Sequence, residues 1–216
     1  MFNYNSSGFF SAIPPVVKNI IIINLLMLLA TFINEEFMIE KFALFYPASS
    51  FFRPHQFLTH IFMHGNFFHL FFNMWMFWIF GTTLEHVWGS KKFLIYYLVT
   101  GVGAAAFHTG VNWLESLSFN RMEYHILLMT PTVGASGAVF GVLLAFGMLF
   151  PNNVIQMLFP PIAIKAKWFV VVCGAFELFL GLSQSGSNIA HFAHIGGMIF
   201  GFILVKYWQR KGRMYF

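Results

Sequence analysis

One serine lies among glycines in the stretch TPTVGASGAVFG, Thr130–Gly141, which contains no charged residue. Such a serine could be a nucleophile, or it could be a small residue that lets two helices touch. As a nucleophile, Ser136 needs a base that accepts its proton, because a serine hydroxyl is otherwise unreactive. Histidine suits this task, since its unperturbed pKa is about 6.5.

Two histidines are candidates for that base. His191 and His194 lie one helical turn apart on the same face, so spacing alone does not separate them. His69 and Asn73 are four residues apart and also share a helical face. Their imidazole and amide could donate hydrogen bonds to a developing oxyanion, together with a backbone N–H at the start of the helix that carries Ser136.

The acid of a Ser-His-acid triad has no evident candidate. The chain contains no Asp, and we interpret Glu177, in the middle of an apolar segment, as structural. His60 and His64 have the i,i+4 spacing of metal ligands, but no adjacent Glu completes an H-E-x-x-H motif. We therefore expect no metal at these two histidines, and we expect them to make hydrogen bonds that hold a loop in place.

The composition indicates a membrane protein. Of 216 residues, 58% are hydrophobic and 9% are charged, against roughly 25% charged in soluble domains. Runs without any charge extend over 54–84, 93–114, 124–164 and 178–205, and a membrane-spanning helix needs about 20 apolar residues. The N-terminus lacks the pattern of a cleavable signal peptide, and the single Cys173 excludes an intramolecular disulfide.

The apolar runs and their breakers predict an all-α fold, a single polytopic membrane domain over residues 1–216. Its six predicted spans are 16–33, 67–86, 93–113, 133–150, 168–183 and 189–208. A large, irregular loop, 34–66, separates the first two spans. The glycine faces Gly137-x-x-x-Gly141 and Gly197-x-x-x-Gly201 would bring Ser136 and His194 together if they packed against each other.

The distribution of basic residues predicts the orientation. Nine Lys or Arg residues are predicted on the side of the membrane that holds both termini. The opposite side has three, Lys41, Arg53 and Arg121. The nine are Lys18, Lys91, Lys92, Lys165, Lys167, Lys206, Arg210, Lys211 and Arg213. The positive-inside rule then places both termini in the cytoplasm, and this bias explains the net charge of +5 without nucleic acid. Spans two, four and six then run from outside to inside. Ser136, the pair His69 and Asn73, and the pair His191 and His194 are therefore expected at similar depth, around one cavity that opens to the outside.

Three motifs in this order resemble those of the rhomboid family of intramembrane serine proteases. Gly134-Ala135-Ser136-Gly137 matches GxSG, His69-Leu70-Phe71-Phe72-Asn73 matches HxxxN, and the segment AHIGGMIFG, 193–201, matches AHxxGxxxG. The six-span layout also fits, so the resemblance extends over roughly Val16 to Trp208.

The resemblance implies a six-helix rhomboid-like bundle in a bacterial inner membrane, with transmembrane protein substrates cleaved near the outer face without metal or cofactor. It implies a nucleophile at Ser136, a base at His194, and oxyanion stabilisation by His69, Asn73 and the Ser136 N–H. His191 is then expected to line the cavity mouth. Phe140 stands where the family often has a tyrosine that stacks on the catalytic histidine.

Phe140 is one departure from the family pattern, a second lies in the first loop, and two other functions remain as alternatives. In the first loop His55-Gln56 replaces the family's Trp-Arg or Trp-Gln pair. An inactive relative that binds or escorts membrane proteins is one alternative, although such proteins usually lose the serine or the histidine. A transporter or proton channel is another, but the inner halves of spans four and six are apolar.

Overall fold

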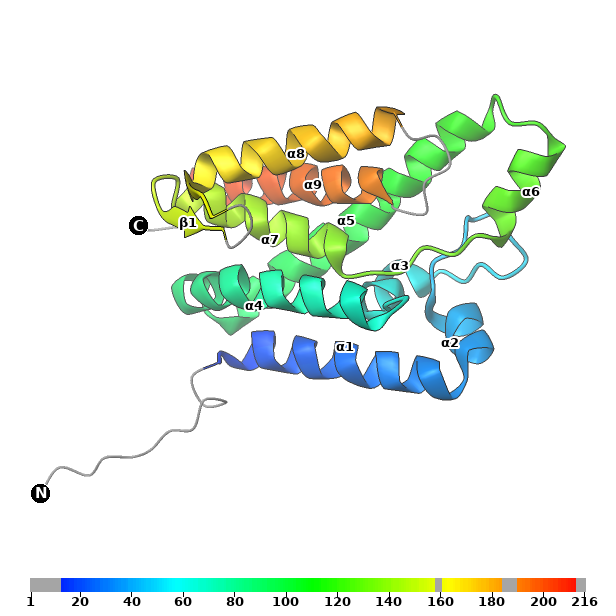
Figure 1. Cartoon of the computed structure of the whole chain (residues 1–216), viewed down its shortest axis with the longest axis horizontal. Coiled ribbons are helices and arrows are strands. Elements are labelled where there is room, and N and C mark those ends of the chain that lie inside the picture. The colour runs from blue at the N-terminus through cyan, green and yellow to red at the C-terminus, as the bar shows by residue number, and fades with distance from the viewer. Residues whose placement is uncertain (1–12, 158–160, 184–189, 213–216) are drawn as a thin grey trace, which may run out of the picture.

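The computed structural model describes residues 13–157, 161–183 and 190–212 and consists mainly of helices packed side by side. The long helices are α1 (Pro15–Ile33), α4 (Phe67–Trp88), α5 (Ser90–Ser116), α7 (Ser136–Leu149), α8 (Ala166–Ser183) and α9 (His191–Arg210). Helices α4, α7 and α9 run in one direction and α1, α5 and α8 in the other (Figure 1). The predicted helical membrane bundle is confirmed.

The helix bounds differ from the predicted spans by a few residues. Helix α7 begins at Ser136 instead of Val133, and α5 is longer than predicted at both ends. The predicted start of the last span, Ile189, lies outside the described residues, as does the polar run 184–188 before it. Within the described chain, α1, α4, α5 and α8 are long and apolar enough to cross a membrane. Helix α7 has 14 residues, so a count of six crossings stays a prediction.

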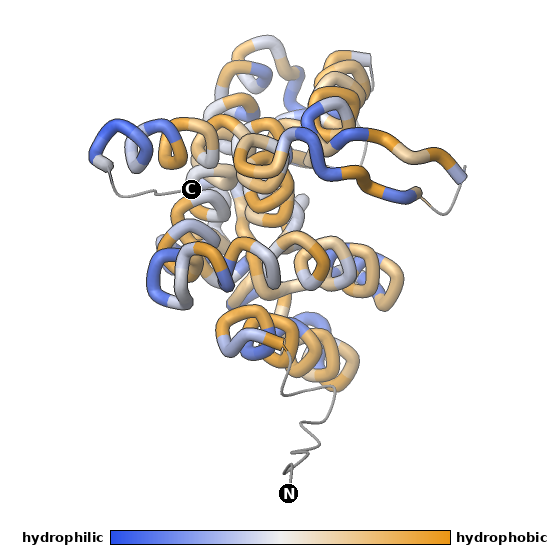
Figure 2. The backbone as a smooth tube through the Cα atoms, turned by 90° about the vertical axis from the view of Figure 1, so that its left-hand side faces the viewer, coloured by the Kyte–Doolittle hydropathy of each residue, from blue (hydrophilic) through white to orange (hydrophobic). Residues whose placement is uncertain are grey.

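The surface of the bundle is apolar where a soluble protein would be polar. Leu26 and Ile33 on α1, Phe68 on α4, and Phe179 and Leu182 on α8 are all exposed large hydrophobic side chains. Figure 2 shows hydrophobic residues along most of each helix and hydrophilic ones toward the helix ends. Lipid is the solvent that makes such a surface favourable, because exposed apolar area is unfavourable in water.

Several short elements lie between the long helices. They are α2 (Glu35–Phe42), α3 (Gln56–Thr59), the 3-10 helix η2 (His60–Phe62), α6 (Arg121–Met129), and the antiparallel strands β1 (Val154–Gln156) and β2 (Ala163–Lys165). The short β1–β2 hairpin was not predicted, and it leaves the all-α fold class unchanged. Helix α6 was not predicted, although its N-terminus carries a capping box. The Asn120 side chain accepts from the Glu123 N–H, and the Glu123 carboxylate accepts from the Asn120 N–H.

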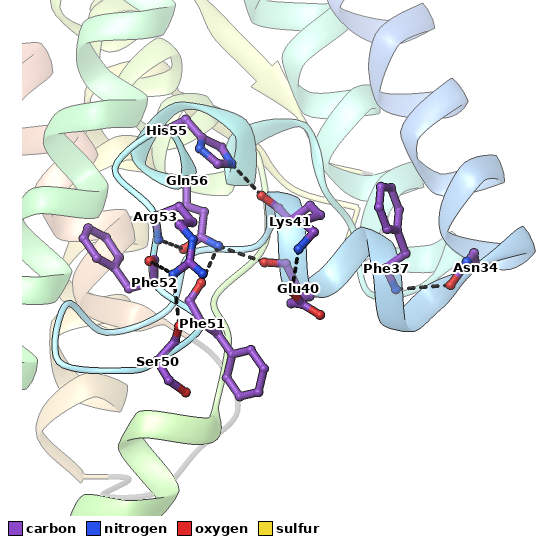
Figure 3. A network of polar contacts seen from close by, with 10 residues as sticks. All are labelled: Asn34, Phe37, Glu40, Lys41, Ser50, Phe51, Phe52, Arg53, His55 and Gln56. Atoms are coloured by element: carbon purple, nitrogen blue, oxygen red, sulfur yellow. Dashed lines mark hydrogen bonds and ion pairs between the residues drawn. The ribbon is translucent and has the colours of Figure 1, made fainter.

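The first loop is organised around the fully buried amide of Gln56 (Figure 3). Its oxygen accepts from the Arg53 N–H at 3.0 Å, and its nitrogen donates to the carbonyl groups of Glu40 and Phe51, each at 3.0 Å. The ring of the neighbouring His55 contacts the Lys41 carbonyl oxygen at 2.7 Å. A buried amide is stable only when its donors and acceptors are satisfied, so Gln56 fixes the course of the loop.

The same loop is bonded to the segment that precedes α7. Leu44 and Thr132 exchange two backbone hydrogen bonds, of 2.9 and 2.8 Å, and the Gly134 N–H donates to the His60 carbonyl at 3.0 Å. These bonds hold the chain in an extended course up to Ala135, the residue before α7. Figure 1 shows the consequence, since α7 begins well short of the ends of α1 and α5.

A buried carboxylate closes the end of the bundle where α1 starts. Glu85, on α4, is 2% exposed and accepts hydrogen bonds from the N–H groups of Val16 and Val17 at 2.9 and 2.8 Å. The Ser90 hydroxyl donates to the same carboxylate at 2.7 Å. The first N–H groups of a helix have no partner within it, so Glu85 satisfies two of them and joins α1 to α4 and α5.

Helices α7 and α9 touch through their backbones. A Cβ atom on Gly197 would overlap the carbonyl oxygen of Gly137, and one on Gly141 would lie 3.1 Å from the carbonyl oxygen of Gly197. Helix α5 packs against both helices, and its Tyr96 hydroxyl donates to the Gly141 carbonyl at 2.7 Å. The predicted contact of the two glycine faces is confirmed.

We expect Gly197→Ala to destabilise the protein by roughly 1–3 kcal/mol, because the added methyl group must displace the Gly137 backbone. Thermal unfolding in detergent micelles measures this. Gly110→Ala is the matched control, since a Cβ at this position of α5 meets nothing within 4 Å. It should leave the midpoint unchanged or raise it, because alanine favours helix. Equal midpoints for the two variants would contradict the assigned backbone contact.

Candidate active site

Ser136 and His194 are in hydrogen-bond contact. Ser136 is the first residue of α7 and His194 lies in the first turn of α9, 58 residues away in sequence. The Ser136 Oγ lies 2.7 Å from the His194 Nε2. Ser136 is half-buried and His194 is 8% exposed. This is the distance at which a histidine can take the proton of a serine hydroxyl.

A carboxylate lies on the other side of His194. The Glu177 Oε2, from α8, is 2.7 Å from the His194 Nδ1 and 2.7 Å from the His191 Nδ1. The sequence pattern predicts only a structural role for Glu177 and does not place it beside the histidines, whereas the packing of α8 on α9 turns its side chain toward them. A signal existed in the sequence: a carboxylate within an apolar helix usually has a polar partner.

The ring of Phe140 lies flat on the ring of His194. The two centroids are 4.4 Å apart and the planes differ by 5°. Phe140 is one turn after Ser136 on α7, so the same helix supplies the hydroxyl and the ring that covers the imidazole face. A phenyl ring lacks the hydroxyl of tyrosine, so it can limit the rotation of His194 only by stacking.

His69 lies beside the residues that lead into Ser136. A Cβ on Gly134 would lie 3.0 Å from the His69 Cε1 and 3.1 Å from its Nε2. Gly134 also has φ of +137°, a backbone conformation that side chains disfavour. A glycine is therefore needed here for two reasons, and it allows the His69 imidazole to approach the backbone two residues before Ser136.

Asn73 is buried one turn further along α4. Its amide nitrogen donates to the His69 carbonyl at 2.8 Å. The first hydrogen bond across the start of α7 joins the Val139 N–H to the Ala135 carbonyl, so the N–H groups of Ser136, Gly137 and Ala138 have no acceptor within the helix. The expected oxyanion donors thus come from α4 and from the α7 N-terminus.

His191 lies beside Glu177 and not beside Ser136. It is 4% exposed, and its Nδ1 is turned to Glu177. Its Nε2 is buried without a hydrogen-bond partner among the described residues. Of the two histidines that spacing left open as a base, His194 is the one in contact with the serine.

Glu177, His191 and His194 could also hold a metal ion. Their ligand atoms all lie within 4.8 Å of one another. Two histidines and a glutamate are a known zinc ligand set. The short contacts have another explanation, because two protonated Nδ1 atoms can both donate to one ionised carboxylate.

The pair His60 and His64 does not match the expectation in full. The His60 Nδ1 bonds the Gln56 carbonyl oxygen at 2.9 Å, as predicted for a loop-holding residue. The prediction is wrong for His64, whose two ring nitrogens are buried without partners in the described chain. Its ring instead lies edge-on to that of His69, with centroids 4.9 Å apart. Burial lowers the pKa of His60 to about 4 and that of His64 to about 3.

Comparison with known proteins shows the family of the chain. Residues 48–211 match the family model of the Rhomboid domain, which is more than half of the chain. The chain belongs to the rhomboid family. The matched region begins in the first loop and includes all three motifs and Glu177. Together with its lipid-suited surface, this makes the chain an integral membrane rhomboid.

Curated rhomboid relatives are similar over about two thirds of this chain. This chain is 31% identical to Rhomboid protease AarA of Providencia stuartii over 66% of this chain's length. It is 34% identical to Rhomboid protease GluP of Bacillus subtilis over 67% of this chain's length. Rhomboid protein 1, mitochondrial, of Saccharomyces cerevisiae is 30% identical over 65%. These matches span 51%, 24% and 38% of the relatives' own lengths, so this rhomboid spans about half or less of each.

The buried neutral His64 predicts that this rhomboid loses stability in acid. In the unfolded chain a histidine takes up a proton near pH 6.5, whereas folded His64 does so only near pH 3. The contribution of neutral His64 to the free energy of unfolding is therefore complete above pH 6.5 and is lost as the pH falls from 6.5 toward 3.

Replacing His64 with Phe should flatten this dependence, because a phenyl ring, somewhat larger than imidazole, has no titratable nitrogen, and neither His64 nitrogen loses a described partner. Unfolding midpoints in detergent at several pH values between 7 and 4 measure the slope. His55→Phe is the control, since His55 is exposed and should leave the slope unchanged. If His64→Phe loses as much stability in acid as the wild type, His64 is not buried in its neutral form.

Proposed function

We propose that this rhomboid is an intramembrane serine endopeptidase that cleaves transmembrane proteins near the outer membrane face. The observation that supports the proposal most is the 2.7 Å contact between the Ser136 Oγ and the His194 Nε2. These residues come from two helices held together by backbone contact, so the pair is preorganised. Two similar relatives are named rhomboid proteases, which supports the same activity.

In the proposed reaction His194 takes the Ser136 proton as the Oγ attacks a peptide carbonyl carbon. The developing oxyanion accepts hydrogen bonds from the His69 ring, the Asn73 amide and the Ser136 N–H. The C–N bond then breaks, and His194 gives the proton to the leaving amine. Water attacks the acyl-enzyme in a second round, with His194 again as the base, and releases Ser136.

The substrate segment must be extended at the cleaved bond. A helical segment keeps its carbonyl groups in its own hydrogen bonds, so they are shielded from attack. The start of α7 short of the ends of α1 and α5 supports attack below the membrane surface, at a site that water reaches from outside (Figure 1).

The orientation is part of the proposal. We infer six membrane crossings with both termini in the cytoplasm of a bacterial cell. The basic residues of the described chain support this, because Lys18, Lys91, Lys167 and Lys206 belong to the helix ends opposite Ser136. Arg213 contributes to the same count but lies outside the described residues.

A serine-reactive fluorophosphonate tests the nucleophile. We expect it to label the wild type in detergent, and Ser136→Ala and His194→Ala to abolish labelling, because one lacks the nucleophile and the other the base. The same variants should lose cleavage of a transmembrane model substrate. Wild-type labelling no stronger than that of Ser136→Ala would favour the alternative, an inactive relative that binds or escorts membrane proteins. Loss of activity in His191→Ala but not in His194→Ala would reverse the assignment of the base.

Metal removal gives a separate prediction. Treatment with EDTA should leave the rate of fluorophosphonate labelling unchanged, because the proposed reaction uses only side chains and backbone N–H groups. The control is the same sample with zinc restored in excess. A labelling rate that EDTA abolishes and zinc restores would show that Glu177, His191 and His194 hold a required metal.

A further inference from the structure

Glu177 is an ionisable group in a helix that is otherwise suited to lipid. From Trp168 to Ser183, α8 carries no other charged residue. Only 11% of the residues of α8 are buried inside the protein. A carboxylate in such a helix is unfavourable unless hydrogen bonds compensate for lost hydration. The Glu177 side chain is nevertheless only 13% exposed and faces the protein.

The contacts of His194 use both ring nitrogens. The Nδ1 faces Glu177 at 2.7 Å and the Nε2 faces Ser136 at 2.7 Å. An ionised carboxylate can only accept, so the Nδ1 must carry a proton. The neutral ring then has its lone pair on Nε2, which is the form that can accept the Ser136 proton.

The carboxylate is itself held in position. His191 donates its Nδ1–H to the same Oε2 at 2.7 Å from a side chain that is 4% exposed. One oxygen atom of Glu177 therefore meets two imidazoles, one of which also contacts the nucleophile. Phe140 covers the face of that imidazole, so the ring of His194 is restrained at both nitrogens and on one face.

We propose that Glu177 is a positioning residue of the active site, so that this rhomboid works with a Ser136–His194–Glu177 triad. The inference rests on the proposed protease function. Glu177 fixes the tautomer of His194 and stabilises the imidazolium that forms when the Ser136 proton moves to Nε2. It takes up no proton itself. The proton on His194 passes to the departing amine in the first round and to the Ser136 Oγ when water releases the acyl group.

The deciding variant is Glu177→Gln, which keeps the shape but removes the negative charge. We expect kcat for a transmembrane model substrate to fall on the order of 10²-fold, with KM within about threefold, because the missing charge acts on the transition state. The rate of fluorophosphonate labelling should fall in parallel. Glu177→Asp keeps a carboxylate and should recover part of kcat.

Glu85→Gln is the matched control, since Glu85 is also a buried carboxylate but contacts the α1 N-terminus instead of the histidines. It should lower the unfolding midpoint and leave kcat of the folded protein unchanged.

The outcomes separate this inference from the proposed function. If the wild type labels and cleaves but Glu177→Gln does so equally fast, the triad is overturned and the protease proposal stands. An equal loss of kcat in Glu177→Gln and Glu85→Gln, following their unfolding midpoints, would also overturn it in favour of a purely structural role. A wild type without labelling or cleavage overturns both.

Discussion

The direct backbone contact between α7 and α9 sets the geometry on which the site depends. At Gly137 and Gly197 no side chain separates the two helices. Ser136 directly precedes the first glycine and His194 lies one turn before the second, so the position of each functional side chain is fixed by a neighbouring backbone contact. The distance between hydroxyl and imidazole therefore does not depend on long, flexible side chains.

Three polar side chains of the described residues are each held by more than one partner. Glu85 satisfies the N-terminus of α1, Gln56 satisfies backbone groups of the first loop, and Glu177 accepts from two histidines. Each joins elements that are distant in sequence. In a low-dielectric environment such bonds are strong and their loss is expensive, so they specify one arrangement where apolar contacts alone would permit several.

The sequence was sufficient for the helical membrane bundle and for the residues that the structure brings together at Ser136. Charge-free runs revealed the helices, and the glycine spacing anticipated the contact of α7 with α9. Glu177 was missed because its role depends on the rotation of α8 about its axis, which an almost uniformly apolar helix does not encode in its periodicity. Gln56 and His64 are buried in an irregular loop, where no periodic pattern distinguishes inside from outside. The start of helix α6 could have been predicted from the sequence, because Asn120 and Glu123 have the spacing of a capping box.

Main-chain hydrogen bonds join the first loop to the segment before Ser136. Leu44 pairs with Thr132, and the carbonyl of His60 receives the N–H of Gly134. Such bonds do not require particular side chains, provided that the backbone keeps its course. Positions of the loop whose side chains are exposed, such as His55, can therefore change without moving the serine, as long as the buried Gln56 keeps the backbone on its course.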